Sequence, residues 1–190
     1  MNILVKRLRA YLIDLIIVIF LLSMVALVYH PDISSYQNKL NELQSNYLIG
    51  EIDFMSYIHE NSKIMKIIDE KSVILNFLNL LILIIYFVIV PYFSNGFTIG
   101  KKFNNIRIKG IKKKKLTLKK LIVRAMIING LFYFIGVIIC SMIITSNYYF
   151  YVISGISFIQ IIVIIVSIFL MIKRKDKRGL HDVLSKTYVK

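Results

Sequence analysis

The 190-residue sequence has no tryptophan, one cysteine and two prolines. The lone Cys140 has no second cysteine with which to form a disulfide or a cysteine-based zinc site, and its apolar surroundings favour a small core side chain. Two prolines and eight glycines are too few for a long flexible linker or a low-complexity segment. The composition therefore excludes a disulfide scaffold and a cysteine-based zinc module.

Charge is absent from a long stretch in the carboxyl-terminal half. Residues 125–172 contain no Asp, Glu, Lys, Arg or His. Over the whole chain 57% of residues are hydrophobic, against about 45–50% in soluble domains. The mean hydropathy is +0.71. We therefore predict an all-α integral membrane protein.

Four segments are long enough to cross about 30 Å of hydrocarbon, which takes about 20 helical residues. They are residues 8–29, 73–93, 121–144 and 149–172. The turn-forming sequence TSNYY separates the last two spans. The first span contains Asp14 and lacks the small-residue exit of a cleaved signal peptide, so we expect it to be retained. Residues 1–190 then form a single membrane domain.

The basic residues are distributed unevenly around these spans. The amino-terminal end is basic, the connection 94–120 carries many Lys and Arg and no acid, and the tail 173–190 is also basic. The connection 30–72 instead holds four Lys and seven acids, a net charge of −3. Because Lys and Arg accumulate in cytoplasmic loops, we predict a multi-pass protein of the cytoplasmic membrane with both termini inside.

The net charge of +15 would suggest nucleic-acid binding in a soluble protein. Its densest part is the run of four lysines at 112–115, with which no aromatic residues interleave. We interpret the run as a topogenic signal that attracts anionic lipid on the cytoplasmic face, and expect no nucleic-acid partner.

The connections have local patterns of their own. The outer loop 30–72 has helical periodicity and predicts two short amphipathic helices, broken near Gly50, that cap the outer face or lie on lipid. In the inner loop, Ile106 and Ile108 alternate with basic residues and predict a short extended piece that turns at Gly110. Thr117 is expected to cap the third span.

Arg7, Ala10 and Asp14 are spaced to share one helical face. Arg7 lies about 10 Å from Asp14 along the axis and is expected to snorkel toward the cytoplasm, so the two are not expected to pair. Ala10 would let another element approach closely. We predict that Asp14 pairs with Arg124, which lies early in the third span at a similar depth.

The second carboxylate of interest, Asp182, has Arg178 and Lys186 at i−4 and i+4. If RGLHDVLSKTY is helical, both side chains can neutralise it locally. His181 is then expected to be a solvated neighbour. The apolar side chains of this helix would form a membrane-facing stripe consisting of Leu180, Val183 and Leu184.

The charged residues Arg7, Asp14, Arg124 and Asp182 admit two interpretations. One is an interhelical network that fixes packing. The other is a site for a monovalent cation or a proton, because ionisable groups inside membranes often mark ion paths. The spans contain no second buried acid, so transport would favour a homo-oligomer.

Four motifs occur in order along the chain: R-x-x-A-x-x-x-D at 7–14, G-x-T-x-G-K at 96–101, an Arg early in the third span, and RGLHDVLSKTYV at 178–189. Together they resemble the RDD family of small multi-span membrane proteins, named for an Arg and two Asp. The name maps onto Arg7, Asp14 and Asp182. The further matching positions are Ala10, Gly96, Thr98, Gly100, Lys101, Arg124 and Gly179.

The resemblance implies a membrane protein for which cation/proton antiport has been described in some family members, whereas other members resemble accessory proteins. The outer loop is longer here than the family pattern leads us to expect. We therefore carry two hypotheses, cation/proton transport and a non-transporting accessory or regulatory protein that binds a partner. No nucleophile–base pair, metal-ligand cluster or cofactor fingerprint is present in the sequence, so we expect neither an enzyme nor a cofactor.

Overall fold

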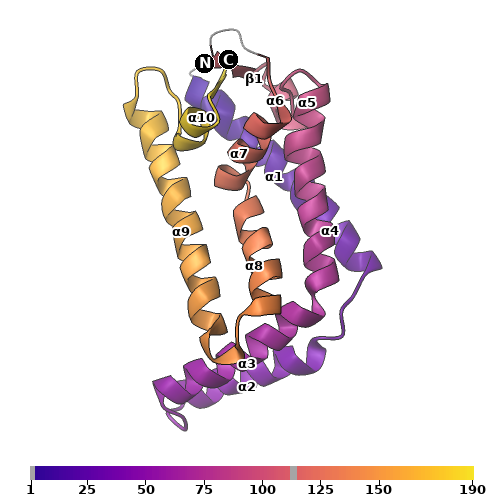
Figure 1. The fold of residues 1–190 in the computed structure, drawn as a ribbon, viewed down its shortest axis with the longest axis vertical. Helices are drawn as coiled ribbons and strands as arrows, with labels where there is room; N and C mark the ends of the chain where they lie inside the picture. Colours follow the sequence, from indigo (N-terminus) through magenta and orange to yellow (C-terminus); the bar gives the residue numbers. More distant parts are fainter. Residues whose placement is uncertain (1–2, 112–114) are drawn as a thin grey trace.

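The fold was analysed in a computed structural model that describes residues 3–111 and 115–190 (Figure 1). Most of the basic run at 112–115 lies outside the described residues. Three helical segments are long and apolar enough to cross a membrane: α1 (Ile3–Val28), the segment Val73–Phe93 and α9 (Ser146–Lys173). They coincide with the predicted first, second and fourth spans. The chain is thus an all-α, multi-pass membrane protein.

The predicted third span is not a single helix. It consists of α7 (Leu118–Ile128) and α8 (Leu131–Ile143), which are bent by 79° relative to each other. Gly130 follows α7 with φ +76°, a left-handed conformation that glycine adopts readily at the end of a helix. The predicted third span therefore consists of two helices, because one glycine in an otherwise apolar run redirects the chain; taken together, the two helices are long and apolar enough to cross a membrane.

The break leaves carbonyl groups at the end of α7 without intrahelical donors. Gln160 of α9 satisfies one of them, since its Nε2 donates to the Ile127 carbonyl at 2.8 Å. Such a polar contact is needed where backbone groups would otherwise face hydrocarbon. The isolated glutamine in the fourth span thus holds the bent segment against α9.

The second span also departs from regular geometry. It runs through α4 (Val73–Ile84), the π-helix η1 (Ile85–Ile89) and α5 (Val90–Phe93). Pro91 has no N–H to donate to the carbonyl of Phe87, and its ring crowds that turn, which accounts for the local widening. The three consecutive side chains Tyr86, Phe87 and Val88 are all buried there.

The outer loop forms the two predicted helices, α2 (Ser34–Leu48) and α3 (Phe54–Lys71), separated at Gly50. Asp53 caps α3 by accepting from the backbone N–H groups of Met55 and Ser56 at 2.8 and 3.0 Å. The α3 helix packs against α8 and α9, and the Tyr149 hydroxyl donates to Asp69 at 2.7 Å. We call this end of the molecule the hairpin end (Figure 1).

Both termini lie at the opposite end, which we call the termini end (Figure 1). It contains the short elements α6 (Ile99–Phe103), β1 (Ile108–Gly110), α10 (Leu180–Leu184) and β2 (Thr187–Val189). The predicted extended piece is β1, which pairs antiparallel with β2, so that Ile108 faces Val189 and Gly110 faces Thr187. The carboxyl terminus is thus fastened to the inner loop.

Gly96 makes this arrangement possible. Its φ is +94°, and a Cβ at this position would lie 2.1 Å from the Ile108 carbonyl oxygen. The Ile108 N–H in turn donates to the Gly96 carbonyl at 2.9 Å. Only glycine fits this conformation and this approach.

Candidate functional site: two buried carboxylates at the termini end

Asp14 lies on the one buried face of α1, which also includes Ala10 and Val18, and its side chain is fully buried. Its Oδ1 accepts from the Tyr86 hydroxyl at 2.6 Å and from the Gly100 N–H at 2.8 Å. Its Oδ2 accepts from the Thr98 hydroxyl at 2.6 Å and from the Lys101 ammonium at 3.2 Å. An ionised carboxylate has about four lone-pair sites, and four donors occupy them.

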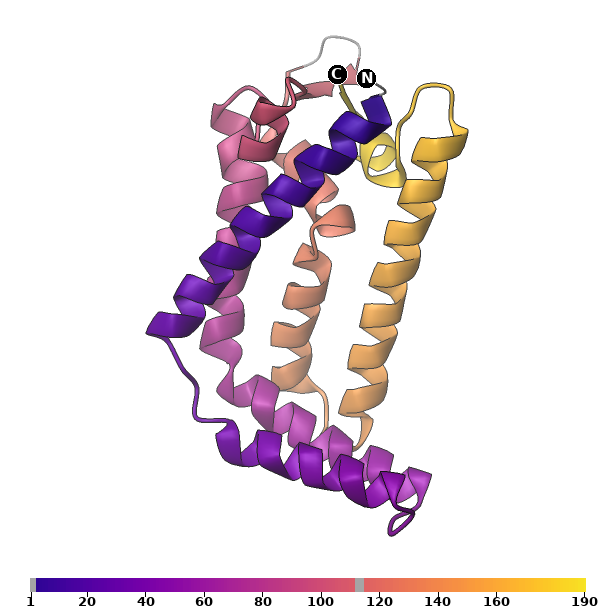
Figure 2. The same ribbon diagram turned by 180° about the vertical axis from the view of Figure 1, so that it is seen from behind.

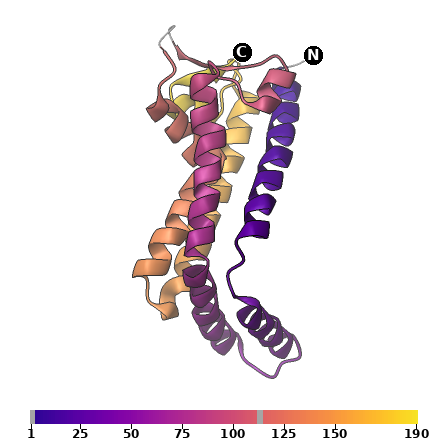
Figure 3. The ribbon, with the colours of Figure 1, turned by 90° about the vertical axis from the view of Figure 1, so that its right-hand side faces the viewer.

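These donors come mainly from α6, which lies beside the first turns of α1 (Figure 3). Thr98 is the N-cap of α6, and Gly100 sits against α1. A Cβ on Gly100 would lie 2.2 Å from the Ala10 carbonyl oxygen and 2.8 Å from Asp14 Oδ1. The small residues Ala10 and Gly100 therefore bring the two helices close enough for the backbone to bind the carboxylate.

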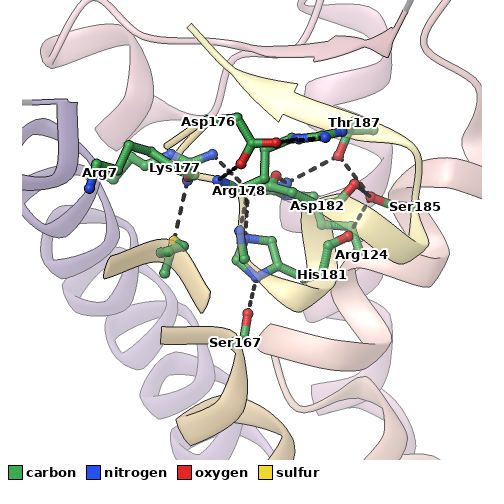
Figure 4. A network of polar contacts seen from close by, with 12 residues as sticks. Arg7, Arg124, Ser167, Asp176, Lys177, Arg178, His181, Asp182, Ser185 and Thr187 are labelled. Carbon is green, nitrogen blue, oxygen red and sulfur yellow. Dashed lines mark hydrogen bonds and ion pairs between the residues drawn. The ribbon is translucent and has the colours of Figure 1, made fainter. Parts of the chain in front are cut away.

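Asp182 is the second buried carboxylate, on α10, and it lies between two arginines (Figure 4). Arg124 of α7 donates to its Oδ1, while Arg7 Nη2 donates to its Oδ2 at 2.7 Å. The Gly179 N–H donates to the same Oδ2 at 3.3 Å. Burial alone would raise the pKa of Asp182, but Arg124, His181 and Arg7 outweigh it and hold that pKa well below its usual range.

The two arginines have further contacts that fix them in place. Arg7 Nη1 donates to the Lys177 carbonyl at 2.5 Å and contacts the sulfur of Met171 at 3.2 Å. Arg124 Nη1 donates to the Thr187 hydroxyl at 3.2 Å. Through Asp182 the two side chains join α1, α7 and the carboxyl-terminal segment (Figure 4).

His181 lies beneath this network and is almost fully buried. Its Nδ1 is 2.5 Å from the Ser167 hydroxyl of α9. Gly179 allows this packing, because a Cβ there would lie 2.7 Å from Ser167 Oγ and 2.8 Å from the His181 ring. Burial, followed by the nearby Arg124, lowers the pKa of His181 to about 3, so the imidazole is neutral at physiological pH.

The predicted partners of the two carboxylates were therefore wrong. Asp14 pairs with Lys101 rather than Arg124, and Arg124 pairs with Asp182. Arg178, predicted to neutralise Asp182, instead contacts Asp176 at 2.7 Å. The reason is that α10 is a helix of five residues, too short to place i−4 and i+4 side chains on the same face.

One further expectation for α10 was wrong, because His181, expected to be solvated, is buried against Ser167. In the predicted apolar stripe, Leu184 is exposed, and Leu180 and Val183 are half-buried. Thr117 does occupy the N-cap position of α7, but its side chain accepts no capping hydrogen bond.

Three contributors to the cluster were not found from the sequence: Tyr86, Ser167 and Thr187. For Tyr86 the available signal was Pro91, which marks an irregular turn within a span. Ser167 gives no signal in the sequence, because hydroxyl residues in spans often bond only to their own helix. Thr187 lies in β2, whose position depends on the return of the chain after α9.

The cluster has a net positive charge. Arg7, Lys101 and Arg124 face Asp14 and Asp182, so three cations meet two carboxylates. In the part of the chain that the structure describes, no group of three or more His, Cys, Asp or Glu side chains could hold a metal ion. The arrangement joins helices by charge-assisted hydrogen bonds, and each carboxylate already has its donors.

The sequence was also compared with known proteins. A model of the RDD family matches residues 3–186. The chain belongs to the RDD family. Searches of curated proteins and of solved structures found no match. In this RDD protein Arg7, Asp14 and Asp182 lie at one end of the molecule, where Arg7 contacts Asp182 directly and Asp14 accepts a hydrogen bond from the Gly100 N–H of α6.

Proposed function

We propose that this RDD protein is a non-transporting accessory or regulatory protein of the membrane, in which the Arg and Asp residues hold the helices together. The observation that carries the proposal is the full set of donors on each carboxylate. Asp14 receives four hydrogen bonds, and Asp182 receives three. A cation could bind to either carboxylate only by displacing donors that are themselves buried, which would leave them unsatisfied.

The charge balance supports the same proposal. With three cationic side chains around two carboxylates, a further cation would enter a site that already has an excess positive charge. Such a site in a low-dielectric interior repels cations strongly. We propose no metal, cofactor or catalytic role for the cluster.

We further propose that the protein lies in the cytoplasmic membrane with both termini inside. The basic segments 94–111, 115–120 and 173–190 belong to the termini end, whereas the acidic connection 30–72 belongs to the hairpin end. This separation follows the rule that Lys and Arg remain on the cytoplasmic side, where they attract anionic lipid.

Single-cysteine labelling tests this orientation. In a Cys140→Ala background, a cysteine replacing Glu51 at the hairpin turn should react with a membrane-impermeant maleimide added outside intact cells. A cysteine replacing Lys190 should react only after the membrane is opened. Reaction of the two positions in the reverse order would contradict the proposed orientation.

The partner surface that we propose for the accessory role is the turn between α2 and α3. Four large apolar side chains are exposed on either side of it, at Leu48, Ile49, Phe54 and Met55. A photo-crosslinking residue at Met55 should capture a protein partner, which is lost when Leu48 and Ile49 are replaced by serine. Capture of lipid alone would show that the turn rests on the bilayer and would remove this surface from the proposal.

The second candidate function is cation/proton transport by a homo-oligomer, and two observations favour it. Tyr86, which binds Asp14, lies in a π-helix, a feature often found at functional sites. Burial lowers the pKa of Lys101, the partner of Asp14, to about 8, so this ammonium releases its proton more easily than an ordinary lysine.

A flux measurement separates the two candidates. The wild type and Asp14→Asn, reconstituted at equal folded yield, are compared in proteoliposomes containing a pH-sensitive dye during pulses of Na⁺, K⁺ or Li⁺. The accessory proposal predicts the same proton leak for both proteins and for empty vesicles. A cation-dependent proton flux that Asp14→Asn abolishes would overturn the accessory proposal and establish transport.

A further inference from the structure

A cavity of about 360 Å³ lies at the termini end, between α1, α7 and α9. Its volume is within the range of about 300–1,000 Å³ that is typical of ligand sites. Figure 2 shows that α1 and α9 diverge away from the termini end. The walls are mainly aliphatic and include Leu8 of α1, Ile128 of α7, and Ile164 and Ile168 of α9.

The cavity opens sideways. Leu8 and Ile168 line it from α1 and α9, yet their surfaces are 60% and 46% exposed. Both belong to helices that are long and apolar enough to cross the membrane. A ligand that enters between them therefore comes from the bilayer and brings an apolar part with it.

The polar lining of the cavity is cationic. It includes Arg7, Lys101 and Arg124, together with His181, which is neutral at physiological pH. Asp14 and Asp182 compensate two of the three cations, so one positive charge is left over. A buried excess charge favours an occupant that carries one negative charge.

One N–H group of Arg7 takes part in no hydrogen bond within the described residues. Its two terminal nitrogens are bonded, but its Nε is buried and has no hydrogen-bond partner among residues 3–111 and 115–190. A buried N–H without an acceptor is costly, so a small movement of the guanidinium toward an anionic oxygen in the cavity would be favourable. The Arg7 side chain lines the cavity.

From this geometry we infer that the cavity binds an anionic membrane phospholipid, with its phosphate at Arg7 and one acyl chain between α1 and α9. The charge selects a lipid with one net negative charge over a zwitterionic one. The lipid places a negative charge beside Arg7 and fills the cavity between α1, α7 and α9.

Fluorescence provides a direct test, because the chain has no tryptophan. Ile164→Trp places a single reporter in the cavity wall. Ile165→Trp is the matched control, since the adjacent residue lies at a similar depth but is 59% exposed and is not part of the lining. Both proteins are reconstituted in zwitterionic vesicles containing a small fraction of brominated phosphatidylglycerol or brominated phosphatidylcholine.

We expect brominated phosphatidylglycerol to quench the reporter at 164 at about a fivefold lower mole fraction than brominated phosphatidylcholine. The reporter at 165 should show no such preference. Adding Ile168→Phe to the Ile164→Trp protein fills the cavity without touching the charged residues and should abolish the preference, which separates occupancy from folding.

The inference would be overturned by equal preference at 164 and 165, by equal quenching by the two lipids at 164, or by no quenching at 164. Inorganic phosphate is the alternative source of the anion. Loss of the preference in its presence would show that the cavity binds free phosphate and would also overturn the inference. The flux measurement does not depend on this cavity, so failure of one proposal can be told from failure of the other.

Discussion

Arg7 and Asp182, 175 positions apart in the sequence, form an ion pair in which Arg7 Nη2 lies 2.7 Å from Asp182 Oδ2. This pair links α1 to α10 at the termini end. Asp182 also compensates Arg124 and is itself fully buried. The carboxyl-terminal segment, which would otherwise end outside the helix bundle, is thereby attached to α1 and α7.

Replacing Asp182 with asparagine should be strongly destabilising, because it leaves two buried arginines without their carboxylate. Removing one partner of a buried ion pair costs about 3–5 kcal/mol. We expect a large fall in the thermal unfolding midpoint in detergent. The double variant Arg7→Gln with Asp182→Asn should lose less than the sum of the single changes, whereas strict additivity would show that the two residues are not energetically coupled.

Gly100→Ala should separate α6 from α1. The added Cβ would lie 2.2 Å from the Ala10 carbonyl oxygen, and overpacking of this kind costs about 1–3 kcal/mol. Gly155→Ala in α9 is the matched control, since a Cβ there meets nothing within 4 Å. The midpoint should fall for the first variant and stay level or rise for the second; equal midpoints would contradict the close approach of α6.

Tyr86→Phe removes the hydroxyl that donates to Asp14 at 2.6 Å. A hydrogen bond to a charged group contributes about 1.5–3 kcal/mol, so we expect a stability loss of that order. Tyr151→Phe is the control, because Tyr151 is 52% exposed. A Tyr86→Phe protein as stable as the control would show that the Tyr86 hydroxyl contributes nothing to holding Asp14.

Stability should fall in mild acid because of His181. Its pKa in the folded protein is about 3 instead of 6.5, so between these values the unfolded state binds a proton that the folded state excludes. The stability that this group contributes is complete above pH 6.5 and is lost as the pH falls. Between about pH 7.5 and about pH 5 the loss should approach 2 kcal/mol.

The measurement for His181 is the unfolding midpoint at those two pH values, for the wild type and for His181→Gln. The variant is expected to be less stable at neutral pH but to change less on acidification. An identical pH dependence in both proteins would mean that His181 titrates normally in the folded state.

The sequence predicted those features that depend on local composition. The long apolar runs identified α1, the segment Val73–Phe93 and α9, and the periodicity of the outer loop identified α2 and α3. Helical spacing also correctly placed Ala10 at a close approach between helices. In each case the evidence lies within a few turns of one helix.

The ion pairs could not be predicted in the same way. Spacing places Asp14 on one face of α1. Which cationic side chain pairs with Asp14 depends on the position of the short helix α6 relative to α1. That position is set by two glycines, Gly96 and Gly100, whose contacts are with residues far away in the sequence. Similarly, β1 was recognisable from its alternation, whereas its pairing with residues 187–189 depends on the return of the chain after α9.

We propose that Asp14 and Asp182 are already satisfied by the protein and do not bind a cation. The most direct test is the unfolding midpoint of the purified protein in chloride salts of Na⁺, K⁺ or Li⁺, each compared with N-methylglucamine chloride at the same ionic strength. Any cation that binds the folded state would raise the midpoint with its concentration. We predict the same midpoint in all four salts; a midpoint that rises and saturates with one of the metal cations, and no longer does so in Asp14→Asn, would show that Asp14 binds that cation.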